Sequence, residues 1–169
     1  MTQPQHNLEI RQPAPSDGPA VTRLIKESPP LDVNSAYCNL LQCSHFATTS
    51  ASAFSGDTLV GFVSGYRVPG RGNTLFIWQV AVSERARGLG LARAMLNDIV
   101  ERAENREVNW LETSITANNS ASWAMFQGFA RSRSAVARRS VMFERDEHFA
   151  GSHETEYLLR IGPLRRSVV

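Results

Sequence analysis

The stretch Leu75-Phe76-Ile77-Trp78-Gln79-Val80-Ala81-Val82 is almost continuously apolar, and Arg87-Gly88-Leu89-Gly90-Leu91-Ala92 follows it closely. A short apolar run of this kind predicts a strand that is buried within a sheet. After Gly88, apolar residues recur at steps of three and four, which predicts an amphipathic helix with one face on a core. The sequence therefore predicts a central strand that leads through a glycine-rich turn into a long helix.

Similar patterns on either side extend this plan. A Gly-containing hairpin turn separates the two strands expected before residue 67, and Ser16 is placed to cap the first helix. The expected strands lie at residues 8–11, 48–54, 58–66, 75–82, 108–115, 141–143 and 155–161. The expected helices lie between Ser16 and Ser28, near residues 36–41, after Gly88 as far as Ala103, and at residues 119–126. The resulting order is β-α-α-β-β-β-α-β-α-β-β.

Composition limits the class of protein. With 169 residues and 42% hydrophobic residues, the chain predicts a single domain, 1–169. Its 18 basic residues nearly balance 16 acidic ones, so no nucleic-acid partner is expected. No apolar run approaches the roughly 20 residues of a membrane span, and the start lacks a signal peptide, so we expect a cytoplasmic protein without a membrane partner. Cys38 and Cys43 have no partner at zinc spacing, and no metal is expected.

The glycine-rich turn has the residue types of an anion site. Backbone N–H groups at a helix start converge on an anion, and glycine at positions 88 and 90 allows phosphate oxygens to approach them. Arg85 and Arg87 add positive charge. A simple strand-to-helix turn and a dinucleotide site with Glu112 on the ribose are alternatives, but Arg93 stands where the dinucleotide fingerprint has a small residue.

Residues 87–92 resemble the motif Gln/Arg-x-x-Gly-x-Gly/Ala of the GNAT acetyltransferase family, and the element order agrees along nearly the whole chain. The resemblance implies the GNAT fold, an α/β architecture of α+β type with a mixed, mostly antiparallel sheet flanked by helices. It also implies acetyl-CoA as acetyl donor and a homodimer. The coenzyme-binding residues that it implies are Val80, Ala81, Val82, Arg87, Gly88, Leu89, Gly90, Leu91, Ala92 and Asn119.

Segments 29–37 (PPLDVNSAY), 76–82 (FIWQVAV) and 153–157 (HETEY) further resemble the branch of that family that acetylates the 4-amino group of L-2,4-diaminobutyrate, a step in ectoine biosynthesis. This resemblance implies a small diamine as substrate. Acetylation of another small amine or of a protein N-terminus is an alternative, and so is a coenzyme-binding sensor without catalysis.

The diamine requires side chains that bind ammonium groups. Asp32 is a candidate, with a helix cap as its alternative role. Trp78 is a second candidate, as a pocket wall or a cation–π partner, unless it is a core residue. Tyr37 lies on the short helix expected beside the substrate.

The C-terminal segment supplies candidate bases. Glu154 and Glu156 flank Thr155 and are expected on one face of a strand, either near the substrate or in solvent. We predict Glu156 as the base that accepts the amine proton, with His153 as the second candidate. The family often has a Tyr as general acid where this chain has Phe126, so that role stays open among Tyr157, Tyr37 and water. The expected reaction is direct attack of the amine on the thioester, without an acyl-enzyme or a metal.

Overall fold

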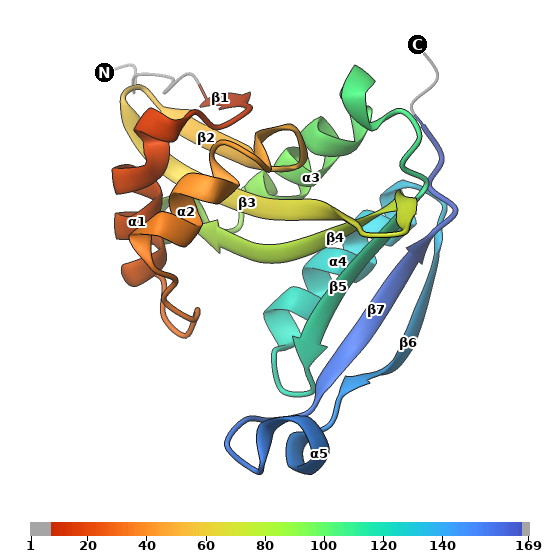
Figure 1. Ribbon diagram of the computed structural model, residues 1–169. Helices are drawn as coiled ribbons and strands as arrows, with labels where there is room; N and C mark the ends of the chain where they lie inside the picture. The colour runs from red at the N-terminus through yellow and green to blue at the C-terminus, as the bar shows by residue number, and fades with distance from the viewer. Residues whose placement is uncertain (1–7, 167–169) are drawn as a thin grey trace. The chain divides into compact units, whose positions relative to one another are not determined.

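The computed structural model describes residues 8–166, which form a mixed seven-stranded sheet in the order β1-β2-β3-β4-β5-β7-β6 (Figure 1). β4 and β5 pair in parallel, whereas β1–β2, β2–β3, β5–β7 and β6–β7 pair antiparallel. The mixed, mostly antiparallel sheet expected from the sequence is confirmed. The chain separates into two compact units, which are described in turn: residues 8–65 with 79–105, and residues 66–78 with 106–166.

The first unit contains the N-terminal strands and three helices. Its strands are β1 (Leu8–Arg11), β2 (Ala51–Ser55), the first part of β3 (Thr58–Val68) and the end of β4 (Arg71–Val82). Its helices are α1 (Gly18–Lys26), α2 (Ala36–Gln42) and α3 (Leu91–Glu101), with short 3-10 turns η1 (Pro15–Asp17), η2 (Ala47–Thr49), η3 (Glu84–Ala86) and η4 (Ala103–Asn105). Its core cluster consists of Val21, Leu24, Ile25, Cys43, Leu59, Phe62 and Ala81.

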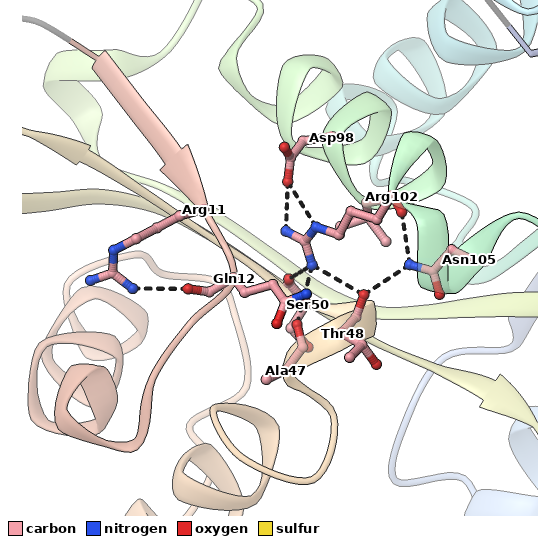
Figure 2. A network of polar contacts seen from close by, with 9 residues as sticks. Arg11, Gln12, Ala47, Thr48, Ser50, Asp98, Arg102 and Asn105 are labelled. Atoms are coloured by element: carbon pink, nitrogen blue, oxygen red, sulfur yellow. Dashed lines mark hydrogen bonds and ion pairs between the residues drawn. The ribbon is translucent and has the colours of Figure 1, made fainter.

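A polar network fixes the end of α3 in this unit (Figure 2). The Arg102 guanidinium donates to the backbone oxygens of Ala47, Thr48 and Ser50 at 3.2, 3.1 and 2.6 Å and also binds the Asp98 carboxylate. Carbonyl groups at a helix end lack intrahelical partners, so Arg102 supplies the donors that η2 requires. The network therefore ties α3 to the segment that enters β2.

The second unit contains the C-terminal strands. Its further elements are β5 (Trp110–Thr116), α4 (Ser120–Ser132), β6 (Val136–Phe143), α5 (Arg145–Phe149) and β7 (Glu156–Gly162), together with parts of β3 and β4. Phe126, Phe129 and Ala130 form the buried face of α4, and Leu111, Ile115, Leu159 and Ile161 are buried in the strands. None of the helices within residues 8–166 is long and apolar enough to cross a membrane.

Several details differ from the sequence-based expectation. The N-cap of α1 is Asp17, not Ser16, and the Asp17 carboxylate instead accepts hydrogen bonds from Arg11 and from the Ala14 N–H. Strand β6 begins at Val136, five residues before the predicted start, and the segment between the last two expected strands, 144–154, contains the helix α5. The His148 ring accepts a hydrogen bond at Nδ1 from the Glu144 N–H at 2.9 Å, which satisfies one donor at the start of α5.

Helix α2, expected near residues 36–41, buries polar side chains and exposes apolar ones. Asn39 and Gln42 are 0% and 1% exposed, whereas Tyr37 and Leu40 are 72% and 39% exposed. The Asn39 amide donates to Thr22 Oγ1 at 2.8 Å, so hydrogen bonding compensates part of the cost of burying a polar side chain. The helix expected from the apolar spacing is confirmed, but that spacing does not mark its buried face.

A buried carboxylate organises one face of the second unit. Glu112 is 1% exposed, and it binds Arg71 through two hydrogen bonds of 2.7 and 3.0 Å and Arg160 through a third. Burial alone would raise the pKa of Glu112, but the hydrogen bonds from the two arginines outweigh it and lower this pKa. Glu112 therefore has a structural role, and the dinucleotide alternative loses its ribose ligand.

Replacing Glu112 by Gln should lower the free energy of unfolding by about 2–3 kcal/mol at pH 7, because hydrogen bonds to charged groups contribute about 1.5–3 kcal/mol. The folded-state pKa of Glu112 is lowered, so its stabilisation is present above the unfolded pKa of about 4.3 and is lost as pH falls through the folded pKa. Urea unfolding at pH 7 and pH 3.5 measures the difference between wild type and variant, with the exposed Glu147→Gln as control. A difference that does not shrink at the lower pH would contradict this role.

Candidate active site

The turn between β4 and α3 has the geometry of an anion-binding loop. Gly88 and Gly90 have φ angles of +77° and +73°, and Gly90 is the N-cap of α3. Such angles strain residues that carry a Cβ, so the backbone itself requires glycine at both positions. Within the described chain no side chain caps α3, so the first N–H groups of the helix lack a side-chain partner, and residues 87–90 before it are exposed. The turn therefore fits the coenzyme pyrophosphate expected from the sequence.

The arginines near this loop differ in their contacts. Arg87 donates from Nε to the Val82 carbonyl at 3.2 Å, which connects the loop to the end of β4. Arg85 lines an open hollow of about 340 Å³ beside the loop, together with Leu8, Ser55, Thr58, Val60, Ala86 and Leu89. Both guanidinium groups thus lie at the surface of the loop region, where they add positive charge for an anion.

The remaining predicted coenzyme contacts belong to two different units. Val80 and Val82 are half-buried at the end of β4, Ala81 is buried between them, and Leu91 and Ala92 begin α3. Asn119, in the second unit, caps α4, because its Oδ1 accepts a hydrogen bond from the Ser122 N–H at 3.2 Å. Its amide nitrogen is the group left to contact a ligand. These coenzyme contacts stay predictions.

Asp32 is not the helix cap considered as its alternative role. Ser35 caps α2, with its hydroxyl oxygen accepting from the Cys38 N–H at 3.1 Å. The Asp32 backbone oxygen accepts from Gln79, while its carboxylate is exposed and has no hydrogen-bond partner among residues 8–166. The Asp32 carboxylate is thus available for an ammonium group. Tyr37 is the second residue of α2 and is exposed.

Trp78 is not a core residue, since 47% of its surface is exposed. Tyr66 supports it edge-on, with ring centroids 6.3 Å apart and an interplanar angle of 89°. Tyr66 also packs on Phe76 at 5.4 Å. An exposed indole held by a neighbouring ring fits the predicted pocket wall or cation–π partner.

Trp78 and Glu156 lie on the same face of the second unit's strands. Phe76, Glu112 and Arg160 stand side by side in register on β4, β5 and β7. Alternate residues of a strand share a face, so Trp78 lies on the face of Phe76, and Glu156 on that of Arg160. Tyr157 points to the other face, where the Arg139 guanidinium covers its ring at 3.8 Å.

His153 and Glu156 form a pair in the segment before and at the start of β7. His153 Nε2 lies 3.7 Å from Glu156 Oε1, and His153 Nδ1 lies 2.7 Å from the Glu154 backbone oxygen. A carbonyl oxygen only accepts, so Nδ1 carries the hydrogen and Nε2 faces the carboxylate. Phe149 packs on the imidazole with ring centroids 4.6 Å apart, which further limits its rotation.

The expectation for Glu154 was wrong in one respect. β7 begins at Glu156, so Glu154 precedes the strand and does not share a strand face with Glu156. Its backbone oxygen, rather than its carboxylate, makes the contact with His153. Phe126 is 3% exposed in α4, which explains an apolar residue at the place where the family often has a Tyr. Sequence reasoning also missed the contact between Asn34 and Gln79.

Comparison with known proteins identifies the class to which this fold and this loop belong. Residues 18–129 match the Acetyltransferase (GNAT) family, and the chain is a member of that family. It is 53% identical to an L-2,4-diaminobutyric acid acetyltransferase of Methylotuvimicrobium alcaliphilum over 94% of this chain and 92% of that relative. It is 48% identical to the enzyme of the same name from Vibrio cholerae, over 94% and 91% of the two chains.

A solved structure agrees with these relatives. Diaminobutyrate acetyltransferase EctA from Paenibacillus lautus, in complex with its substrate L-2,4-diaminobutyric acid and coenzyme A, is 34% identical and has a TM-score of 0.89. The match covers 97% of this chain and 99% of EctA. The ribosomal-protein-S18-alanine N-acetyltransferase from Escherichia coli, 15% identical with a TM-score of 0.66 over 95% and 96% of the chains, shares the fold alone. The expected family is confirmed.

Replacing Gly90 by Ala should weaken coenzyme A binding by roughly 5- to 30-fold, because relief of a left-handed strain of about 1–2 kcal/mol would turn the loop N–H groups away from the ligand. Gly56→Ala is a matched control, since Gly56 has φ +58° in the β2–β3 hairpin and no atom within 4 Å of the added Cβ. Calorimetric titration of both variants measures the coenzyme affinity. Equal weakening in both would show that the loop has no special role.

Proposed function

We propose that this protein transfers an acetyl group from acetyl-CoA to the 4-amino group of L-2,4-diaminobutyrate. The identity of 53% to a diaminobutyric acid acetyltransferase, over nearly the full length of both chains, carries this proposal. The exposed Asp32 carboxylate, the half-exposed Trp78 ring and the His153–Glu156 pair support it, because carboxylates and aromatic rings can bind an ammonium group and a carboxylate–imidazole pair can accept a proton. The product is a precursor for cyclisation to ectoine by a separate synthase.

The substrate amine must lose a proton before it reacts. An alkyl amine has a pKa of about 10.4, so supplying its neutral form at pH 7 costs about 4–5 kcal/mol. Glu156 accepts this proton, and His153 shares it, because the hydrogen on Nδ1 leaves the lone pair of Nε2 facing the carboxylate. With the proton between them, His153 Nε2 and the Glu156 carboxylate attract each other, whereas without it the lone pair and the negative charge repel each other. Phe149 and the Glu154 carbonyl keep the imidazole oriented for this role.

The neutral amine then attacks the thioester carbonyl carbon. A C–N bond forms, the C–S bond breaks, and the electron pair leaves on sulfur as a thiolate. The nitrogen then releases its second proton to solvent water as it becomes an amide, and the thiolate takes a proton from the solvent, so that one proton is released overall. The N–H groups of Val80 to Val82 stabilise the developing negative charge on the carbonyl oxygen, as the family resemblance implies. In this proposal Asp32 and Trp78 are each a candidate partner for the other ammonium group. Cys43 is not a nucleophile in this scheme, because burial raises the pKa of its thiol to about 12.

The proposed substrate is tested by measuring coenzyme A release with diaminobutyrate, ornithine, lysine, a polyamine and an N-terminal peptide. Because one methylene changes discrimination by roughly 10- to 200-fold, we expect kcat/KM for diaminobutyrate to exceed that for ornithine by at least about tenfold. NMR of the product should show acetylation at N4. Preference for another amine would show that diaminobutyrate is not the substrate. No turnover with any amine would favour a coenzyme-binding sensor.

Replacing Glu156 by Gln should lower kcat by roughly 10²- to 10⁴-fold, the usual contribution of a general base, and should leave acetyl-CoA affinity within about twofold. Rapid-mixing kinetics and coenzyme titration measure the two quantities separately. Glu147→Gln removes an exposed acid from α5 and is the matched control. A parallel loss of turnover and coenzyme affinity would refute the assignment of Glu156 as base.

We also propose that residues 1–169 act as one domain and assemble into a cytoplasmic homodimer. β3 and β4 each continue from one compact unit into the other, which favours a single domain. Val136, Val141 and Phe143 are 57%, 49% and 41% exposed on the edge strand β6, and a second copy would cover such apolar surface. Light scattering should give twice the chain mass of 18.7 kDa, and cell fractionation tests the compartment.

A further inference from the structure

Gln79 commits both ends of its side-chain amide to the loop that carries Asp32. Its Nε2 donates to the Asp32 backbone oxygen at 2.8 Å, and its Oε1 accepts from Asn34 Nδ2 at 2.8 Å. All three residues belong to the first compact unit. The amide of one strand residue thus holds two residues of a loop that lies 45 positions away in sequence.

The same loop is also attached on its helical side. Asn34 Nδ2 lies 3.5 Å from Asn39 Oδ1, and the fully buried Asn39 donates to Thr22 Oγ1 on α1 at 2.8 Å. Ser35 caps α2 immediately after Asn34. A chain of amide contacts therefore runs from β4 through the loop to α2 and α1. It fixes the loop backbone from two directions.

A purely structural role does not account for Gln79. It is the one hydrogen-bonding amide side chain in the otherwise apolar stretch from Leu75 to Val82, and it directly precedes Val80. The Asp32 carbonyl that it binds lies at the exposed surface, where water would satisfy it equally well. The amide gains little for folding by replacing that water. What it does provide is a fixed position of the loop relative to the end of β4.

We infer that Gln79 and Asn34 act as positioning residues that hold the Asp32 carboxylate at a fixed distance from the end of β4, and so select the length of the diamine. The inference rests on the proposed function, in which Asp32 binds one ammonium group while the other amine reacts. A carboxylate held in place accepts only a diamine whose second amine reaches the acetyl carbon. A loop released from Gln79 accepts diamines of different lengths.

The test uses Gln79→Leu, which removes both contacts at similar volume, Asn34→Ala, and the double variant. With either single change, we expect KM for diaminobutyrate to rise roughly tenfold, because displaced binding groups weaken ground-state binding. The ratio of kcat/KM for diaminobutyrate over ornithine should fall at least about fivefold, and coenzyme affinity should stay within about twofold. Because the two residues act together, the double variant should lose little more than either single variant.

Gln42→Leu is the matched control, because the buried Gln42 amide on α2 has no hydrogen-bond partner among the described residues and takes no part in the chain of contacts. It should leave both KM and the selectivity ratio unchanged. An unchanged selectivity ratio in Gln79→Leu would overturn the inference, and so would an equal loss of coenzyme affinity, which would indicate a general distortion of β4.

Hydrogen–deuterium exchange of residues 31–36 in the ligand-free protein separates this inference from the proposed function. Gln79→Leu should speed exchange of these amides at least about tenfold, whatever the substrate, and Gln42→Leu should not. If the wild type fails to use diaminobutyrate but exchange rises in Gln79→Leu as expected, the proposed substrate is wrong and the positioning role of Gln79 is supported. If exchange is unchanged in Gln79→Leu, the positioning role of Gln79 is wrong even when diaminobutyrate is the substrate.

Discussion

Strand β4 is the constraint on which the rest of the structure depends, because its twelve residues contribute in turn to the core, to the proposed substrate face and to the start of the glycine-rich loop. Its parallel pairing with β5 runs from Thr74 to Ile77, and Thr113 Oγ1 donates to the Ile77 carbonyl at 3.0 Å where this pairing ends. That register determines which residues face outward. Trp78 therefore lies exposed beside Tyr66, Gln79 reaches the Asp32 loop, and the strand runs on into the Gly88 turn.

Local patterns were sufficient for the elements that bury one continuous apolar face. β1 and α3 follow from alternation and from three- and four-residue spacing, whereas β6 gives no such signal because nearly all of its residues are exposed. α5 is five residues long and polar, too short for any hydrophobic period. In α2 the apolar spacing predicted the helix but not the side chains that it buries. Asn39 is buried because it donates a hydrogen bond to Thr22, and no local pattern contains that partner.

The candidate site divides in the same way. The coenzyme loop could be predicted from sequence because its chemistry is local: Gly88 and Gly90 are needed for the backbone angles of the turn itself. His153 and Glu156 could be proposed because they are three residues apart, but the Glu154 carbonyl that orients His153 belongs to the backbone and leaves no trace in side-chain identity. The contact of Gln79 with Asn34 joins residues 45 positions apart and required the fold.

The proposed coenzyme contacts and the proposed acceptor contacts differ in the kind of group that makes them. The groups that we propose to bind coenzyme are mostly backbone N–H groups, whose positions depend on torsion angles rather than on side chains. The groups that we propose to bind the acceptor are the side chains of Asp32 and Trp78, whose neighbours Gln79 and Tyr66 hold them. If these assignments hold, a substitution among the side chains changes the acceptor without disturbing the turn at Gly90. Acceptor specificity in such a protein therefore lies in the supports of the binding residues as much as in those residues themselves.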